Sequence, residues 1–141
     1  PDIDFGPHLI VEIEDYAGPS DMDGLFPLFD RLPGEIGMTP IMRPYLLQAQ
    51  LPHGEPVLSA MTMIAESHVS LHLLPDEGRA YFDLFSCSFF DSGAVLPRLK
   101  ERLPGRWVRE VLIPRGREYR TFRTERADER QRTSRWLDAI R

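Results

Sequence analysis

The sequence predicts an α+β fold, a two-layer sandwich in which helices cover one face of a mostly antiparallel sheet. Segments with strand-like alternation outnumber segments with helical spacing, and they follow the order strand, helix, several strands, helix, strand. This order is typical of helices gathered on one face of a sheet. The chain has 141 residues, of which 42% are hydrophobic, and this is enough for one domain with one core.

The N-terminal part is expected to hold one strand and one helix. Residues 8–14 (HLIVEIE) are apolar residues interrupted by carboxylates that would face outward, which is typical of a strand. Ser20 and Asp23 then have the spacing of a capping box, with Asp as its acidic member. Apolar residues follow at helical spacing, and the Pro-Gly pair at 33–34 is expected to end the helix.

The middle of the chain is expected to hold four strands. Residues 40–50 (PIMRPYLLQAQ) are strand-like, but Pro44 cannot donate to a sheet, so an edge strand or a bend is predicted. Three segments rich in apolar, β-branched and aromatic residues follow a loop: 57–66, 69–74 and 79–87. The sequence PDEG between the last two segments predicts a hairpin turn.

The C-terminal part is expected to begin with a helix and a strand. Asp91 or Ser92 can cap the helix, and residues 106–114 (RWVREVLIP) alternate like a final strand. Beyond this strand the sequence is dense in Arg and Glu. We therefore expect one folded domain over 1–116 and a charged, helical tail over 117–141.

Composition and charge exclude several classes of function. The net charge of -5 and the pI of about 5.4 argue against a nucleic-acid partner, which usually needs a basic face. No apolar run approaches the roughly 20 residues that span a bilayer, and no signal peptide is evident, so no membrane partner is expected. The single cysteine, Cys87, is typical of a reducing cytoplasm, and the four histidines show no zinc spacing, so no metal is expected.

Polar residues interrupt the central strands. Alternate residues of a strand share a face, so in a straight strand His68, Ser70 and His72 lie on one face and Ser67 on the other. A bend between Glu66 and Ser67 would relax this separation. The full set of candidate residues is Ser59, Glu66, Ser67, His68, Ser70, His72 and Cys87.

Each of these residues alone is more often structural than functional, because serines and histidines in strands are usually satisfied by hydrogen bonds. A serine hydrolase is conceivable, but the G-x-S-x-G motif is absent. A nucleophile pair of Cys87 and His72 is possible by composition, yet no local signature supports it.

Together, however, these residues form a specific pattern. The segment AESHVSLHLLPDEG, followed by YFDLFSC, resembles the prokaryotic type of the S-adenosylmethionine decarboxylase family. That family carries an E-S-H segment with a second His and a Pro, then a D-x-F-[TS]-C segment, and a serine eight residues before the serine of E-S-H. All three features are present, and the similarity covers roughly residues 6–114, including the HLIVEI strand.

The resemblance implies a self-processing, pyruvoyl-dependent decarboxylase of polyamine biosynthesis. Ser67 would attack the carbonyl of Glu66, the peptide would become an ester, and elimination would leave a β chain of residues 1–66. The remaining chain from residue 67 would begin with a pyruvoyl group, which binds the substrate amine as a Schiff base and accepts the electrons when CO2 leaves. Neither PLP nor a metal would be needed. The resemblance also implies a homodimer of two-chain units with sites near the interface.

The resemblance implies further roles within the motif. Ser59 and His72 would assist self-cleavage by orienting the ester and moving protons. Cys87 would return a proton to the substrate carbon after CO2 has left. Ser70 is expected to be structural.

The sequence departs from the family where the substrate's adenine is held. Leu74 replaces an aromatic residue that stacks on one face of adenine, and His53 occupies the position of the second aromatic, unless Tyr45 or Pro52 substitutes for it. The acidic residue that contacts the ribose in the family is Asp76 here, where the family has Glu. Stacking of a base on an aromatic is worth roughly 1–3 kcal/mol, so much nucleoside affinity would be lost.

We therefore predict a changed substrate, L-ornithine or L-arginine. Its distal cation would pair with Asp76, Glu77 or Glu55. Acidic residues in such positions are as often simply part of a solvent-exposed turn. A short acid-lined pocket would favour these amino acids. The alternative is a genuine S-adenosylmethionine decarboxylase that makes decarboxylated S-adenosylmethionine for spermidine synthesis, and an aromatic pair at the site would favour it. A third reading is a non-catalytic paralogue that activates a partner decarboxylase.

Overall fold

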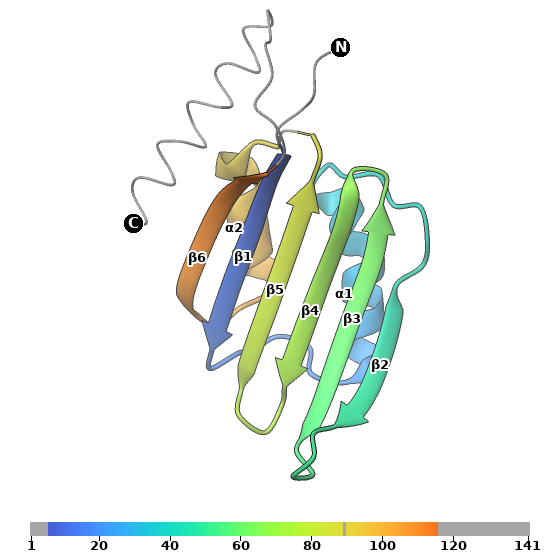
Figure 1. The fold of residues 1–141 in the computed structure, drawn as a ribbon, viewed down its shortest axis with the longest axis vertical. Helices are drawn as coiled ribbons and strands as arrows, with labels where there is room; N and C mark the ends of the chain where they lie inside the picture. The colour runs from blue at the N-terminus through green and yellow to red at the C-terminus, as the bar shows by residue number, and fades with distance from the viewer. Residues whose placement is uncertain (1–5, 89, 116–141) are drawn as a thin grey trace, which may run out of the picture.

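The computed structural model describes residues 6–88 and 90–115, which form six strands and two helices (Figure 1). The elements are β1 (Gly6–Glu14), α1 (Met22–Glu35), β2 (Tyr45–Gln50), β3 (Pro56–Ile64), β4 (Ser67–Leu74), β5 (Arg79–Ser86), α2 (Ser92–Arg102) and β6 (Arg106–Arg115). The predicted helical tail over 117–141 lies outside the described residues.

The six strands form one sheet in the order β2-β3-β4-β5-β1-β6, and every neighbouring pair is antiparallel. Both helices lie behind this sheet in Figure 1, on the same face. The expected α+β sandwich, with helices on one face of an antiparallel sheet, is therefore confirmed.

Strand alternation decides which side chains enter the core. Val69, Leu71 and Leu73 of β4 are fully buried, and they belong to one cluster with Phe29 and Leu32 of α1. Burying a side chain of this size contributes about 1.5–3 kcal/mol. His68, Ser70 and His72 alternate with these three and therefore face the other side of the sheet.

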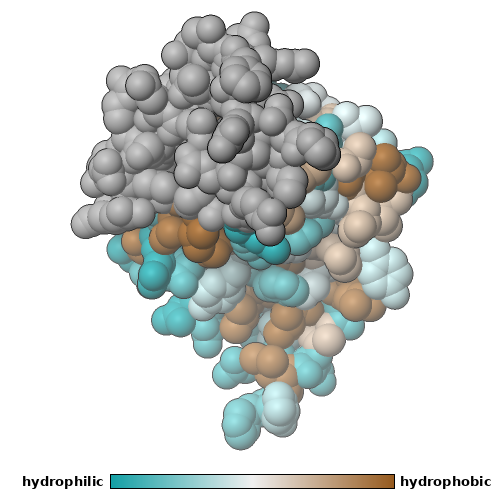
Figure 2. Space-filling view, turned by 45° about the horizontal axis from the view of Figure 1, so that its top comes forward, coloured by the Kyte–Doolittle hydropathy of each residue, from teal (hydrophilic) through white to brown (hydrophobic). Residues whose placement is uncertain are grey.

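We call the side of the sheet without helices the open face. No described helix or strand covers it (Figure 1). Figure 2 views this face obliquely and shows hydrophobic residues, in brown, among polar neighbours. Several large apolar or aromatic side chains are exposed on the open face. They include Tyr45, Leu47, Met61, Met63, Tyr81 and Ile113. Contiguous exposed apolar surface of this kind usually marks an interaction site.

Helix α1 differs from the prediction at both ends. Its N-cap is Asp21 rather than Ser20, because the Asp21 carboxylate accepts a hydrogen bond from the Gly24 backbone N–H at 2.7 Å. The helix also continues through residues 33–34 and ends at Glu35. The Pro33 side chain is buried, and its packing helps the helix to continue past a residue that cannot donate a backbone hydrogen bond.

Two strand boundaries differ from the prediction: β3 ends at Ile64 rather than at residue 66, and β4 begins at Ser67 rather than at residue 69, because residues 65–66 form the turn between them. The other elements predicted within the described residues are present. β2 is an edge strand that starts directly after Pro44. The PDEG turn at 75–78 joins β4 and β5 as a hairpin. Asp91 caps α2 by accepting a hydrogen bond from the Gly93 N–H at 3.0 Å. No described helix has the length and apolar character needed to cross a membrane.

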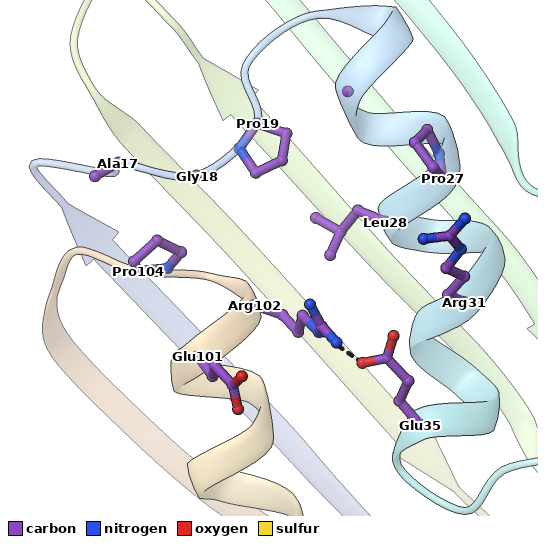
Figure 3. Close-up of a pocket in the computed structure, with 11 residues that line it drawn as sticks. Ala17, Gly18, Pro19, Pro27, Leu28, Arg31, Glu35, Glu101, Arg102 and Pro104 are labelled. Atoms are coloured by element: carbon purple, nitrogen blue, oxygen red, sulfur yellow. Dashed lines mark hydrogen bonds and ion pairs between the residues drawn. The ribbon is translucent and has the colours of Figure 1, made fainter.

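A groove of about 410 Å³ separates the two helices (Figure 3). Arg102 of α2 donates a hydrogen bond to Glu35 of α1 across it, at 2.6 Å, and so links the two helices. The groove lies on the helical side of the sheet, and no residue of the predicted catalytic set lines it.

Candidate active site

The predicted cleavage bond lies at a corner where the chain turns from β3 into β4. Ile64 pairs with Ser67 across this hairpin, so only Ala65 and Glu66 make the connection. Two residues form the shortest common hairpin loop, and the turn is correspondingly tight. The anticipated bend is therefore present, but it lies before Ser67, which is the first residue of β4 and is partly exposed.

The carbonyl group that Ser67 would attack already has a hydrogen-bond donor. The backbone N–H of Cys87 donates to the Glu66 carbonyl oxygen at 2.8 Å. Pairing of β4 with β5 places Ser86 opposite Ser67, and this register brings Cys87 to the corner. A fixed donor at this oxygen is suited to hold negative charge that develops there.

The Glu66 side chain is held by Thr39, in the segment between α1 and β2. The Thr39 N–H and hydroxyl donate to the two carboxylate oxygens at 3.0 and 2.9 Å, and the Thr39 carbonyl accepts from the Ala65 N–H at 2.9 Å. Burial raises the pKa of Glu66, but these hydrogen bonds outweigh it and hold the pKa below its usual value. Sequence reasoning missed Thr39, because nothing in its loop marks a contact 27 residues away.

Ser59 and His72 form a second group. They are direct cross-strand partners on β3 and β4, and the Ser59 hydroxyl lies 2.8 Å from Nδ1 of His72. Both side chains are on the open face, where His72 is exposed. A serine hydroxyl against an imidazole is an arrangement that can accept and return a proton.

These two groups do not meet within one chain. Ser67 and His72 are five residues apart on one straight strand, which is about 16 Å at roughly 3.3 Å per residue. Ser67 has a φ of 159°, outside regular strand geometry, so the alternation that places His72 on the open face does not fix the direction of the Ser67 side chain. The predicted catalytic residues therefore form a corner half-site, of Glu66, Ser67 and Cys87, and a Ser-His half-site, of Ser59 and His72.

The family model described as S-adenosylmethionine decarboxylase matches residues 7–116, from β1 through β6. The chain belongs to the S-adenosylmethionine decarboxylase family. The match confirms the resemblance inferred from the E-S-H and D-x-F-[TS]-C segments. This family is pyruvoyl-dependent, with the pyruvoyl group derived from a serine of the chain itself.

Individual relatives match the chain over part of its length. The S-adenosylmethionine decarboxylase proenzyme of Thermotoga maritima is 37% identical over 68 residues, which is 48% of this chain and 50% of that protein. The proenzyme of the same name from Geobacillus kaustophilus is 29% identical over 59 residues, 42% of this chain and 48% of that protein. The chain thus spans about half the length of the curated relatives it matches.

The residues predicted to contact the substrate lie at the end of the sheet that carries the Ser-His half-site. Leu74 ends β4, Asp76 and Glu77 lie in the turn that follows, and His53 lies in the loop between β2 and β3 (Figure 1). His53, Asp76 and Glu77 are exposed, and Glu77 approaches Arg79 at 3.6 Å.

A hollow of about 380 Å³ opens on the open face beside the Ser-His half-site. Leu47, Met61 and Met63 supply apolar walls, and none of the lining residues is a carboxylate. Tyr45, one of the residues considered as a replacement stacker for adenine, also lines it and is 56% exposed. A single chain therefore presents an apolar hollow here rather than the short acid-lined pocket that would favour a basic amino acid.

Proposed function

We propose that this chain is a self-processing, pyruvoyl-dependent decarboxylase of polyamine biosynthesis that cleaves itself between Glu66 and Ser67. The observation that carries the proposal is the 2.8 Å hydrogen bond from the Cys87 N–H to the Glu66 carbonyl oxygen. It belongs to the peptide group that Ser67 must attack if it is to become a pyruvoyl group. The proenzyme names of the relatives support the same reading.

Self-cleavage begins when Ser67 Oγ adds to the carbonyl carbon of Glu66. Negative charge then develops on the oxygen that the Cys87 N–H contacts, and removing one such donor typically costs roughly 10²–10³ in rate. Breaking the C–N bond frees the amine of residue 67 and leaves an ester. Loss of the α-proton of residue 67 expels the Glu66 carboxylate, and water then releases ammonia and leaves the pyruvoyl group.

The residues around the corner fit a pyruvoyl group at position 67, because the strand pairing brings the exposed Cys87 beside the start of β4. When formed, the group supplies a ketone that binds the substrate amine and an amide carbonyl that accepts the electrons released with CO2. The chain's own residues hold and protonate: the Cys87 thiol would return a proton to the substrate carbon. Thr39 holds the Glu66 carboxylate at the corner.

We further propose that a second copy of the chain completes the site. The Ser-His half-site is about 16 Å from Ser67 in the same chain, too far for a side chain to bridge. The open face carries exposed apolar side chains suited to burial against another protein. In a two-fold symmetric dimer, the same contact would bring each corner half-site to the Ser-His half-site of the other copy, giving two composite sites.

The proposed substrate is an α-amino acid with a distal positive charge. L-ornithine or L-arginine is the first candidate, because Leu74 and His53 offer no aromatic face for adenine. The carboxylates that would pair with the distal cation, Asp76 and Glu77, lie at the same end of the sheet but outside the apolar hollow. S-adenosylmethionine is the second candidate, favoured by Tyr45 on the apolar hollow and by the names of the relatives.

The test is an intact-mass spectrum of the purified chain after incubation with cyanoborohydride and a mixture of S-adenosylmethionine, L-ornithine and L-arginine. Two fragments that sum to the full chain, with an amine adduct on the 67–141 fragment, are expected, and the adduct mass identifies the substrate. An uncleaved chain without an adduct would overturn the enzyme proposal. If that chain then raised the activity of an added decarboxylase, it would be an activating paralogue.

A further inference from the structure

Three side chains to which the proposed function gives no role converge on the open face. His8, His68 and Asp83 each come from one of the motif segments HLIVEI, ESH and DLFSC. Because β5 lies between β4 and β1, the register places both histidines opposite Phe85, one on each side. One ring nitrogen of each histidine and one oxygen of Asp83 lie within 4.8 Å of one another.

We propose that His8, His68 and Asp83 form a binding site for a divalent transition-metal ion of the Zn²⁺ type. Two imidazoles and one carboxylate form a ligand set typical of zinc and iron sites, whereas Mg²⁺ and Ca²⁺ prefer oxygen ligands alone. The three ligands come from strands that are far apart in sequence, so no local zinc spacing could reveal them.

The geometry is close to what a metal ion requires. Ligand atoms on a tetrahedral zinc lie about 3.3 Å apart, given metal–ligand distances of about 2.0–2.1 Å. Nε2 of His8 and Oδ1 of Asp83 are already 2.8 Å apart, so small side-chain rotations would close the set. All three ligands rise from one face of the sheet, so a fourth position points away from it, toward water or a second copy.

The surroundings favour metal binding over simple solvation. The His8 side chain is only 16% exposed, and that of Asp83 is 37% exposed. Burial lowers the pKa of His68, an effect that His8 and Arg115 reinforce and Asp83 opposes. A neutral imidazole is the form that offers a lone pair to a metal.

One neighbouring cation gives the proposal a distinctive signature. Arg115 lies with its guanidinium 3.7 Å from the centre of the Phe85 ring and with Nη1 3.4 Å from Nδ1 of His8. A bound ion would replace the proton shared by His8 and Asp83, and the positive charge of Arg115 would oppose it. Removing that charge should therefore tighten metal binding, which a purely structural His-Asp pair does not predict.

The test is metal binding by the untagged full chain after chelator treatment, measured by calorimetry with Zn²⁺ and by visible spectroscopy with Co²⁺. One ion per chain and a tetrahedral Co²⁺ spectrum are expected. Groups that merely support a ligand contribute about 10- to 100-fold in affinity, so His68→Gln and Asp83→Asn should each weaken binding by about 100-fold or more. Arg115→Gln should strengthen it.

The matched control is His53→Gln, which removes an exposed histidine of the β2–β3 loop and should bind like the parent chain. Ser67→Ala should also bind equally, which separates this proposal from self-cleavage. The midpoint temperature of thermal unfolding, measured with chelator present, must be the same for all variants. Unchanged affinity in His68→Gln and Asp83→Asn, or a Co²⁺ spectrum with thiolate bands from Cys87, would overturn the site.

Discussion

Two variants that each fail to cleave should restore cleavage when they are expressed together. Ser67→Ala removes the nucleophile of the corner half-site and keeps the Ser-His half-site, whereas His72→Ala does the reverse. About 16 Å of β4 separates the two residues, so one chain cannot supply both to the same site. A mixed two-fold dimer therefore contains one composite site with both defects and one with neither.

Random pairing sets the expected yield. With equal amounts of the two chains, about half of all dimers are mixed, and about half of the His72→Ala chains meet an intact His72 from the other copy. About half of these chains should be cut, and no Ser67→Ala chain should be. The matched control combines Ser59→Ala with His72→Ala: both changes affect the Ser-His half-site, so every site in a mixed dimer lacks one member.

The assay is intact-mass analysis of the co-expressed chains, since the His72→Ala fragment from residue 67 onward has its own mass. Size-exclusion chromatography and tag-based capture establish that mixed dimers are present. If those dimers contain no fragment, the composite site is refuted. If His72→Ala alone is cut like the parent chain, His72 has no part in cleavage.

Three further predictions follow from single contacts. Thr39→Val removes one hydroxyl hydrogen bond to Glu66, worth roughly 0.5–1.5 kcal/mol at a partly exposed site, and should slow self-cleavage about 2- to 10-fold in a gel time course, while Thr39→Ser should not. Leu71→Ala empties a fully buried position and should lower the free energy of unfolding by about 2–5 kcal/mol, measured with urea. Burial lowers the pKa of His68 from 6.5, so the unfolded chain binds the proton first. The free energy of unfolding should therefore not depend on His68 protonation above pH 6.5 and should fall as the pH drops below that value. If the urea midpoint has the same pH profile in His68→Gln, this prediction is contradicted.

The sheet was predictable because each strand buries only one face. In β4 the alternation of Val69, Leu71 and Leu73 with polar residues fixes which side meets the helices. The start of α1 was harder, because Ser20 and Asp21 are adjacent acceptors and only the backbone geometry selects Asp21 as the cap.

The sequence predicts a set of site residues but not how they are arranged. Residue types at fixed spacings identify the E-S-H segment and Cys87 as candidates. The pairing of β4 with β5 then brings Cys87 to the corner. The division into two half-sites depends on where the bend falls, and a shift of one residue in a strand reverses the face of each side chain. The contact between Thr39 and Glu66 joins a loop to a hairpin 27 residues away, and the local sequence does not predict it.

The strand order has a consequence for the processed protein. After a cut between Glu66 and Ser67, the first fragment would contain β1, β2 and β3 and the second would contain β4, β5 and β6. β1 would then be threaded between two strands of the other fragment, and three of the five strand ladders, β3–β4, β5–β1 and β1–β6, would join the fragments. The cut would therefore leave the sheet intact but convert its unfolding into a dissociation. Reassembly would become a second-order reaction, so the stability of the mature protein would rise with its concentration, whereas that of the uncut chain within one subunit would not.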